Sequence, residues 1–231
     1  MIKVMVVDDY VPTLKKISTF VNQSEQYHVI ASLMDGEEMV QYFRNNSVLP
    51  DIVVLDIQMW KMDGLTAMDY LHDFFPEIKV IAFSAFIQGN VVNDMFAGGA
   101  FAFIWKENYS FYLIEALKSL ESGQPYIDPR IKFEIGTREY LMQERQKEKQ
   151  SVYEQFKLTN RETEIVKLIS FNKDYKHIYE VLKISPRAIK NYFKHFNGRF
   201  KLHEIRLTNF FLKRSAQSVE NRQDVKKNAD V

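Results

Sequence analysis

Residues 51–64 read DIVVLDIQMWKMDG, and the first half of the chain is interpreted outward from this stretch. Four apolar residues, 52–55, predict a strand that is buried on both faces of a parallel sheet. The strand ends at the carboxylate of Asp56, and a turn signal, Asp63-Gly64, follows it. Open parallel sheets carry their reactive groups at the carboxyl ends of their strands, so Asp56 is a candidate reactive residue.

Short apolar runs and amphipathic segments alternate over residues 1–123. The apolar runs predict strands at 2–7, 28–33, 52–55, 79–84 and 101–105. Each strand is followed by a segment with the apolar spacing of a helix, and the last helix is expected at 110–121, before Gly123. This alternation predicts an α/β fold with a doubly wound, five-stranded parallel sheet, as in flavodoxin-like proteins.

Polar side chains stand at the ends of four predicted strands. They are Asp8 and Asp9, Asp56, Ser84 and Lys106. Strand ends of a doubly wound sheet lie along one rim, so we expect these groups to converge. Three carboxylates repel one another and favour a hard divalent cation with oxygen ligands, for which we expect Mg²⁺. Ser84 and Lys106 would then bind phosphoryl oxygens, and Asp56 would be the nucleophile that forms an aspartyl phosphate.

Charge divides the chain into two parts. Residues 1–123 contain 8 Lys/Arg against 16 Asp/Glu, and residues 124–231 contain 23 against 14. An acidic half joined to a basic half indicates two domains, the basic one facing a polyanion. The sequence has no cysteine, no run of apolar residues long enough for a membrane span and no signal-peptide pattern at its start. We therefore expect a cytoplasmic protein that makes no membrane contact.

Two segments of the basic half are expected to lie outside a compact domain. Residues 124–157 contain Pro125 and Pro129 and then a charged stretch, which indicates a linker that is partly helical. Residues 215–231 are polar and charged, and we expect a mobile tail there. The predicted domains are therefore residues 1–123 and residues 158–214.

Residues 158–214 are predicted to form a helical domain that binds DNA. They carry 13 Lys/Arg against 5 Asp/Glu. Thr159 and Glu162 have the spacing of a capping box, and Ser185 is the expected cap of a later helix. One face of that later helix carries a polar, mainly basic stripe, and Lys176 on the preceding predicted helix is a further candidate for DNA contact. The stripe consists of Arg187, Lys190, Asn191 and Lys194. Such side chains neutralise phosphates and pair with base edges in the major groove.

The first 123 residues resemble the receiver domain of two-component response regulators. The matching motifs are Asp8-Asp9, D-I-x-M-x-x-M-D-G from Asp56, Ser84-Ala85, and G-A-x-x-F-x-x-K from Gly99 to Lys106. The resemblance implies that a sensor histidine kinase phosphorylates Asp56. It implies that Mg²⁺ is held by Asp8, Asp9, Asp56 and the backbone carbonyl of Gln58. It also implies that Ser84 and Phe103 form a switch pair that responds to the phosphoryl group.

Residues 158–214 resemble the LuxR-type helix-turn-helix of the NarL/FixJ subfamily, through L-T-x-R-E-x-E-I at 158–165 and I-S-P-R-x-I-K-N at 184–191. The resemblance implies an all-α module of four helices that reads double-stranded DNA through its third helix. The last helix, near residues 203–213, carries the dimer candidates Ile205, Phe210 and Phe211. The implied function is transcription regulation, in which phosphorylation of Asp56 favours a DNA-binding homodimer. Two mechanisms stay open: phosphorylation pairs the receiver domains, or it releases the basic domain from an acidic receiver surface, which the division of charge permits.

Enzyme interpretations meet specific obstacles. A haloacid-dehalogenase-like phosphatase would need a second Asp two residues after Asp56, where Gln58 stands. A dinucleotide-binding oxidoreductase would need a glycine-rich turn after the first strand, which is absent. We therefore expect no enzyme activity beyond self-catalysed phosphoryl transfer to Asp56 and hydrolysis from it. The alternative that stays open is a DNA-binding regulator whose receiver-like domain is an interaction module and is never phosphorylated; Trp60, where the family usually has proline, supports it.

Overall fold

The computed structural model describes residues 1–60, 62–87, 89–132 and 136–155 as continuous segments. Beyond Gln155 it describes residues 157, 159, 162–163, 165, 183–185, 187–188 and 191–192. The chain divides into two compact units, Met1–Lys147 and Glu148–Val231. Among the described residues, no helix combines the length and the apolar character that a bilayer span requires.

Six parallel strands form the sheet of the first unit, in the order β2-β1-β3-β4-β5-β6. They are β1 (Ile2–Val7), β2 (Tyr27–Leu33), β3 (Ile52–Asp56), β4 (Lys79–Ser84), β5 (Ala102–Trp105) and β6 (Tyr126–Ile127). Every residue of β3 is buried, as its unbroken apolar run predicts. The register pairs Val53 with Met5 on β1 and with Val80 on β4, so the carboxyl ends of these strands reach the same edge. The expected doubly wound parallel sheet is confirmed.

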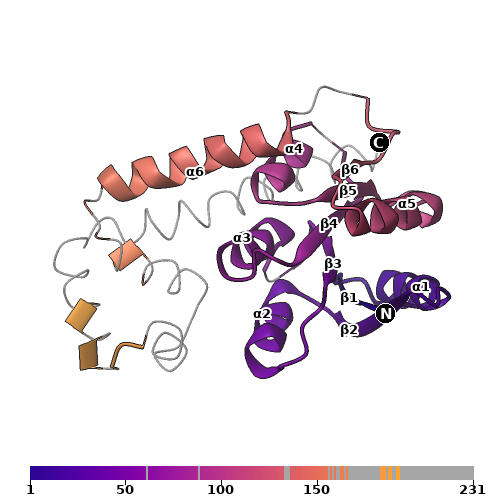
Figure 1. Cartoon of the computed structure of the whole chain (residues 1–231), viewed down its shortest axis with the longest axis horizontal. Helices are drawn as coiled ribbons and strands as arrows, with labels where there is room; N and C mark the ends of the chain where they lie inside the picture. Colours follow the sequence, from indigo (N-terminus) through magenta and orange to yellow (C-terminus); the bar gives the residue numbers. More distant parts are fainter. Residues whose placement is uncertain are drawn as a thin grey trace, which may run out of the picture. The chain divides into compact units, whose positions relative to one another are not determined.

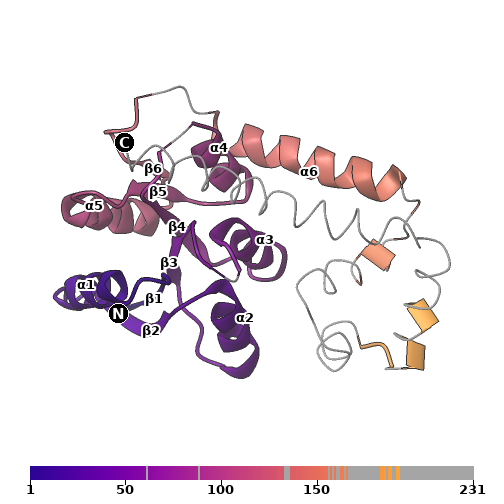
Figure 2. The same cartoon turned by 180° about the vertical axis from the view of Figure 1, so that it is seen from behind.

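Five helices cover the two faces of the sheet: α1 and α5 lie on one face, and α2, α3 and α4 lie on the other (Figures 1 and 2). They are α1 (Val11–Asn22), α2 (Gly36–Asn45), α3 (Gly64–Phe74), α4 (Gly89–Ala97) and α5 (Ser110–Glu121). On the first face, Ile17 of α1 and Leu117 of α5 join Val54 of β3 in one buried cluster. On the second face, Met68 and Phe96 are almost completely buried. Both layers exclude water from the sheet, which is why its central strands are apolar between their ends.

Local sequence sets the ends of the helices that border the site. Asp63 is the N-cap of α3, and its Oδ1 accepts the Thr66 N–H at 2.8 Å. Helix α4 ends in a Schellman arrangement, in which the Ala100 N–H donates to the Met95 carbonyl at 3.0 Å. Gly99 within it has a φ of +106°, a conformation that favours glycine. These two ends fix the loop after β3 and the loop before β5.

The sheet differs from the predicted one by its sixth strand. β6 lies in the segment assigned to the linker and pairs with β5, so that Ile127 stands opposite Phe103. Asp128, directly after β6, is completely buried, and its N–H donates to the Phe103 carbonyl at 3.0 Å. The predicted number of five strands is therefore wrong. A two-residue strand between Pro125 and Pro129 is too short to show a period in the sequence.

A long helix, α6 (Arg138–Gln155), follows the sheet, and residues 138–147 of it belong to the first unit. Arg145 makes two hydrogen bonds with Asp69 of α3, from Nε to Oδ1 at 3.2 Å and from Nη2 to Oδ2 at 2.5 Å. Arg138 donates to the carbonyls of Gly99 and Ala100 at 2.9 and 2.8 Å. The first part of α6 is therefore held against α3 and the loop before β5.

In the second unit, the described residues include two of the predicted helix caps. The Glu162 N–H donates to Thr159 Oγ1 at 3.2 Å, and the Thr159 N–H donates to Glu162 Oε2 at 2.8 Å, which is the reciprocal pattern of a capping box. The Ala188 N–H donates to Ser185 Oγ at 3.2 Å. Both caps are confirmed. The other parts of the predicted all-α domain, including residues 166–182 and 193–214, lie outside the described residues.

Candidate functional site

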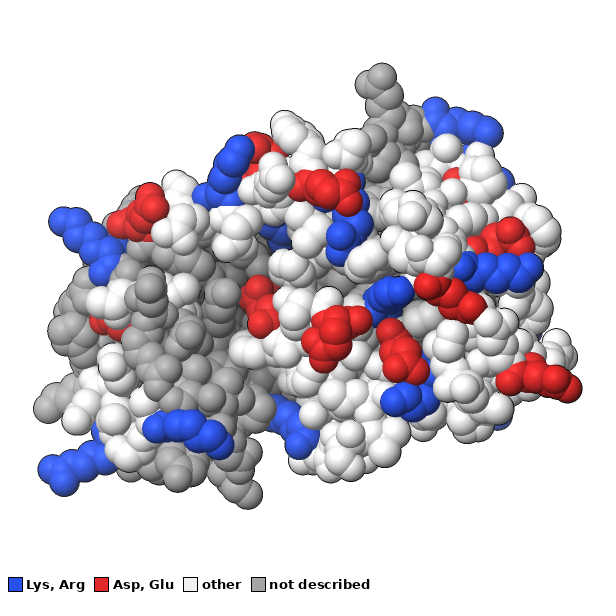
Figure 3. Space-filling view, in the orientation of Figure 1, with Lys and Arg blue, Asp and Glu red and all other residues white. Residues whose placement is uncertain are grey.

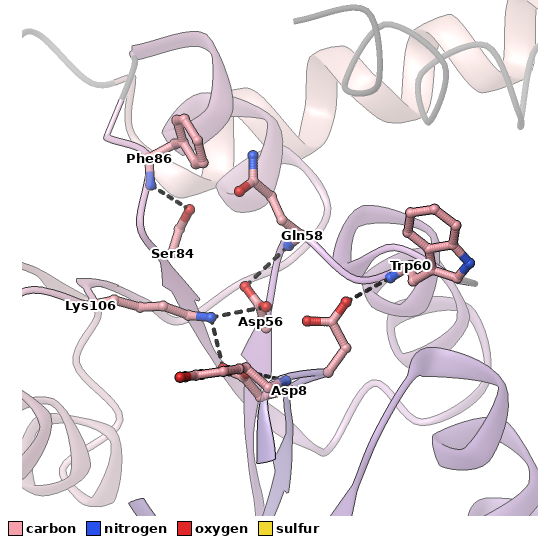
Figure 4. A network of polar contacts seen from close by, with 9 residues as sticks. Asp8, Asp56, Gln58, Trp60, Ser84, Phe86 and Lys106 are labelled. Carbon is pink, nitrogen blue, oxygen red and sulfur yellow. Dashed lines mark hydrogen bonds and ion pairs between the residues drawn. The ribbon is translucent and has the colours of Figure 1, made fainter. Parts of the chain in front are cut away.

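Side chains from four strand ends meet at the carboxyl edge of the sheet (Figure 4). Asp8 follows β1, Asp56 ends β3, Ser84 ends β4 and Lys106 follows β5. Asp8, Asp56 and Ser84 have exposed fractions of only 1%, 3% and 0%. The structure thus brings together the groups that the sequence predicted to converge.

Lys106 joins the two buried carboxylates. Its Nζ lies 2.7 Å from Asp8 Oδ2 and 2.9 Å from Asp56 Oδ2. The backbone N–H of Lys106 donates to the Ser84 carbonyl at 2.7 Å, which fixes the base of the side chain to β4. The ammonium group also lies 5.4 Å from the centre of the Phe83 ring. Lys106 is therefore held at both ends, with its charge directed at Asp56.

Burial dominates the electrostatics of Asp56. Desolvation raises the pKa of Asp56 and the charge of Asp8 raises it further, whereas the charge of Lys106 and the hydrogen bonds from Lys106 and Gln58 lower it. The balance raises the pKa of Asp56 to about 6. The Gln58 N–H donates to Asp56 Oδ1 at 3.1 Å. At neutral pH Asp56 is therefore mainly ionised, the form that a nucleophile requires.

Asp8, Asp9 and Asp56 form a group that suits a metal ion. Each offers a carboxylate oxygen, and these oxygens lie within 4.8 Å of one another. A donor set made only of carboxylates fits a hard divalent cation such as Mg²⁺ rather than a soft metal, which prefers sulfur or nitrogen. The backbone carbonyl of Gln58 stays a predicted fourth ligand.

Ser84 and Phe103, the predicted switch pair, are both completely buried. Ser84 Oγ accepts the Phe86 N–H at 3.0 Å, so its own hydrogen is left for donation to another group. Phe103 lies on β5, the neighbour of β4 in the sheet. Their roles as a switch stay predictions.

Trp60 does not cap the site. Its ring points away from Asp56 (Figure 4) and is 86% exposed. Its backbone N–H donates to Asp9 Oδ2 at 2.9 Å. In the same way, the N–H of the exposed Tyr10 donates to Asp8 Oδ1 at 2.9 Å. Two of the carboxylates thus hold the backbone of two exposed aromatic residues at the rim of the site.

Most of the residues predicted to contact DNA lie outside the described part of the chain. Arg187 and Asn191 are described, and both are exposed. Lys176, Lys190 and Lys194 are not described, nor are the dimer candidates Ile205, Phe210 and Phe211. On the face of the molecule in Figure 3, acidic and basic side chains are interspersed among the described residues.

Sequence reasoning missed two charged pairs that tie the segment after α5 to the sheet domain. Arg145 pairs with Asp69, 76 residues away. Arg130 pairs with Asp128, and both reach the backbone around Lys106. No local pattern predicts the first pair. An aspartate directly after an apolar dipeptide, at Tyr126-Ile127-Asp128, was the available signal for the second.

Comparisons with known proteins agree with this geometry. Residues 4–118 match the family model of the response regulator receiver domain. The transcriptional regulatory protein DegU of Brevibacillus brevis is 27% identical, over 83% of this chain and 84% of its own. The oxygen regulatory protein NreC of Staphylococcus epidermidis is 28% identical, over 87% of this chain and 91% of its own. A solved structure of two RcsB dimers bound to two parallel DNAs is 18% identical with a TM-score of 0.53, over 84% of this chain and 89% of that one, and shows a shared fold.

Proposed function

This chain belongs to the two-component response regulators of the NarL/LuxR family, regulators rather than conventional enzymes, and on this premise we propose that Asp56 is its phosphoacceptor. The observation that carries the proposal is the environment of Asp56. Its buried carboxylate is one of the three that come together here, and it is paired with Lys106 at 2.9 Å. A carboxylate placed in this way is shielded from water, and its oxygen can attack a phosphoryl group that binds at the edge of the sheet.

The proposed step transfers a phosphoryl group to a side-chain oxygen of Asp56. The oxygen attacks phosphorus while the bond to the donor breaks, a P–N bond in the phosphohistidine of a sensor kinase or a P–O bond in acetyl phosphate. The bonding electron pair leaves with the donor, and an acyl phosphate forms on Asp56. Lys106 and the Ser84 hydroxyl would stabilise the phosphoryl oxygens. Mg²⁺, held by Asp8, Asp9, Asp56 and the Gln58 carbonyl, would supply the charge that offsets repulsion between carboxylates and phosphate.

The test is the intact mass of the protein after incubation with acetyl phosphate and Mg²⁺. We expect wild type to gain one phosphoryl group and Asp56→Asn to gain none. Asp51→Asn is a matched control, because Asp51 lies just before the same strand, β3, and is exposed. Phosphate on Asp56→Asn, or its absence from wild type, would contradict the proposal. In the second case the alternative, a regulator with an unphosphorylated interaction domain, is favoured.

For the second unit, the proposal is sequence-specific binding to DNA that phosphorylation strengthens by favouring a homodimer. It is supported by membership in this family of DNA-binding regulators and by the exposure of Arg187 and Asn191. The proposed contacts also include Lys176, Lys190 and Lys194, and the proposed dimer contacts are Ile205, Phe210 and Phe211. Neutralising one phosphate-contacting residue should lower the slope of log affinity against log salt by about one.

Selection of bound duplexes from a random pool, followed by fluorescence anisotropy, tests this second proposal. We expect Arg187→Ala to weaken binding, and Lys157→Gln, which changes an exposed charge that is not part of the predicted stripe, to leave it unchanged. Beryllofluoride with Mg²⁺ should shift the sedimentation of wild type towards a dimer, and Phe211→Ala should reduce that shift. Equal DNA affinity of wild type and Arg187→Ala would contradict the assignment.

A further inference from the structure

Arg130 binds the backbone on both sides of Lys106. Its Nη2 donates to the Trp105 carbonyl at 3.1 Å, and its Nη1 donates to the Glu107 carbonyl. The guanidinium also stacks on two rings, with its Cζ 4.9 Å from the centre of the Trp105 ring and 4.1 Å from that of Tyr112. The residues before and after the lysine of the phosphoacceptor site are therefore held by one side chain.

Asp128 completes this arrangement from the end of β6. Its Oδ2 accepts the Trp105 N–H at 3.2 Å, so it too binds the residue before Lys106. Its carboxylate accepts hydrogen bonds from Arg130 Nε at 2.8 Å and from Arg130 Nη2 at 2.5 Å. The pair thus orients Arg130 while also binding β5 directly. We call these two residues the Asp128–Arg130 pair.

The segment that the pair holds is conformationally demanding. Asn108, two residues after Lys106, has a φ of +48°, in the left-handed region that asparagine tolerates better than most residues. Such a turn persists when surrounding contacts fix it. Burial opposes ionisation of Asp128, but hydrogen bonds from Arg130 and Trp105 outweigh it and hold the pKa of Asp128 below its ordinary value. At neutral pH both side chains of the pair are therefore charged, and hydrogen bonds join them.

We propose that the Asp128–Arg130 pair is a positioning element for Lys106, through which the chain beyond α5 sets the rate of phosphoryl transfer to Asp56. This inference rests on the proposed function. Among the described residues, the pair makes no hydrogen bond or ion pair with Asp56. It acts by fixing the backbone from which the Lys106 side chain reaches Asp56 and Asp8. The residues lie after the last helix of the sheet domain, in the segment that leads to α6.

The chain offers a matched control for this role. Arg138 also donates to two carbonyls at β5 and stacks on a ring, with its Cζ 4.0 Å from the centre of Phe101. Its contacts, however, are with Gly99 and Ala100, at the opposite end of the strand from Lys106. Arg130→Met and Arg138→Met each remove two hydrogen bonds to carbonyls and the stacking of a guanidinium on a ring, but only the first also removes the ion pair with Asp128 and the contacts with the backbone next to Lys106.

The experiment measures initial rates of phosphorylation by acetyl phosphate and Mg²⁺ in full-length protein, read by intact mass. Misplacing a reacting group by about 1 Å can lower the rate roughly a hundredfold. Lys106 keeps its backbone hydrogen bond to Ser84 in Arg130→Met, so we expect this variant to slow phosphorylation only about tenfold. We expect Arg138→Met to stay within about twofold of wild type. Arg130→Lys, which keeps the charge but has a single donor nitrogen, should fall between the two and serves if Arg130→Met does not fold.

A double-mutant cycle separates positioning from a general structural role. In a Lys106→Met background the Asp128–Arg130 pair has no lysine to position, so adding Arg130→Met should change the remaining rate by less than about twofold. An undiminished effect in that background, or equal slowing by Arg130→Met and Arg138→Met, would overturn the inference. Wild type that takes no phosphate at all would instead overturn the proposed function, and the two failures are thus distinct.

Discussion

Replacing Asp69 by leucine leaves the Arg145 guanidinium buried without its counterion. The two residues are 8% and 7% exposed and share two hydrogen bonds. Arg145 Nη1 is also buried and has no hydrogen-bond partner among the described residues, so it offers no compensation. Breaking a buried pair from one side costs roughly 3–5 kcal/mol. Helix α6 can avoid that cost by leaving α3, because Arg145 then reaches water. We therefore expect Asp69→Leu to detach the first part of α6 while the sheet domain stays folded.

Amide hydrogen exchange, read by mass spectrometry for residues 138–147, measures this detachment. We expect faster exchange in Asp69→Leu and in Arg145→Met. Replacing both members of a buried pair by apolar residues is often neutral, so the double variant Asp69→Leu/Arg145→Met should recover most of the protection. Glu144→Gln is the control, because it breaks the exposed pair of Glu144 with Lys147 on the same helix and should change nothing measurable.

Two results would refute this reasoning. If both single variants exchange like wild type, the pair does not hold α6 on α3. If the double variant loses protection equal to the sum of the two single losses, the side chains act independently and the cost is not that of an unpaired buried charge.

Three further predictions concern the fold around the site. Gly64→Ala would place its Cβ 2.2 Å from the Asp56 carbonyl oxygen, so we expect a loss of stability of roughly 1–3 kcal/mol or more and slower phosphorylation. Gly123→Asn is the tolerant control, because Gly123 has a φ of +73° and no atom lies within 4 Å of an added Cβ. Equal melting temperatures for the two variants would contradict the argument. Asp63→Ala removes the N-cap of α3 and should cost about 1 kcal/mol in urea denaturation, whereas an unchanged midpoint would show that the cap contributes nothing. Folding lowers the pKa of Asp128 because hydrogen bonds from Arg130 and Trp105 outweigh its burial. The ionised form of Asp128 therefore stabilises the fold at pH values above its unfolded pKa of about 3.9, and this stabilisation is lost as the pH falls below that value. The difference in melting temperature between wild type and Asp128→Asn should accordingly shrink from neutral pH to about pH 3, and a constant difference would be evidence against this linkage.

The sequence predicted those features that depend on local periodicity or on strand ends. The alternation of apolar runs with helical segments determined the doubly wound sheet, and the rule that strand ends share one rim placed Asp8, Asp56, Ser84 and Lys106 together. Ser185 and Thr159 were recognisable as caps because a cap and the backbone N–H that donates to it are close in sequence. These predictions needed no long-range information.

Features that depend on distant contacts were missed. Strand β6 is defined by its pairing with β5, and two residues carry no period of their own. Besides Asp128, the partners of Arg130 are backbone carbonyls of residues 105 and 107, and any residue type presents a carbonyl. Arg145 and Asp69 lie on separate helices, the first in a charged stretch and the second between apolar residues, and neither local pattern indicates its partner. The orientation of Trp60 follows from a backbone bond to Asp9, which no side-chain pattern reveals.

That bond between the Trp60 amide and the Asp9 carboxylate has a thermodynamic consequence. A cation bound by Asp9 would share this carboxylate with the loop that carries the exposed indole. Binding of the cation and binding of a partner to the Trp60 ring are then not energetically independent when either of them moves the loop. Linkage is reciprocal. If the cation changes the affinity for a partner that binds the Trp60 ring by some factor, the partner changes the affinity for the cation by the same factor. Any contact that moved this loop would then change the affinity of the site for the cation.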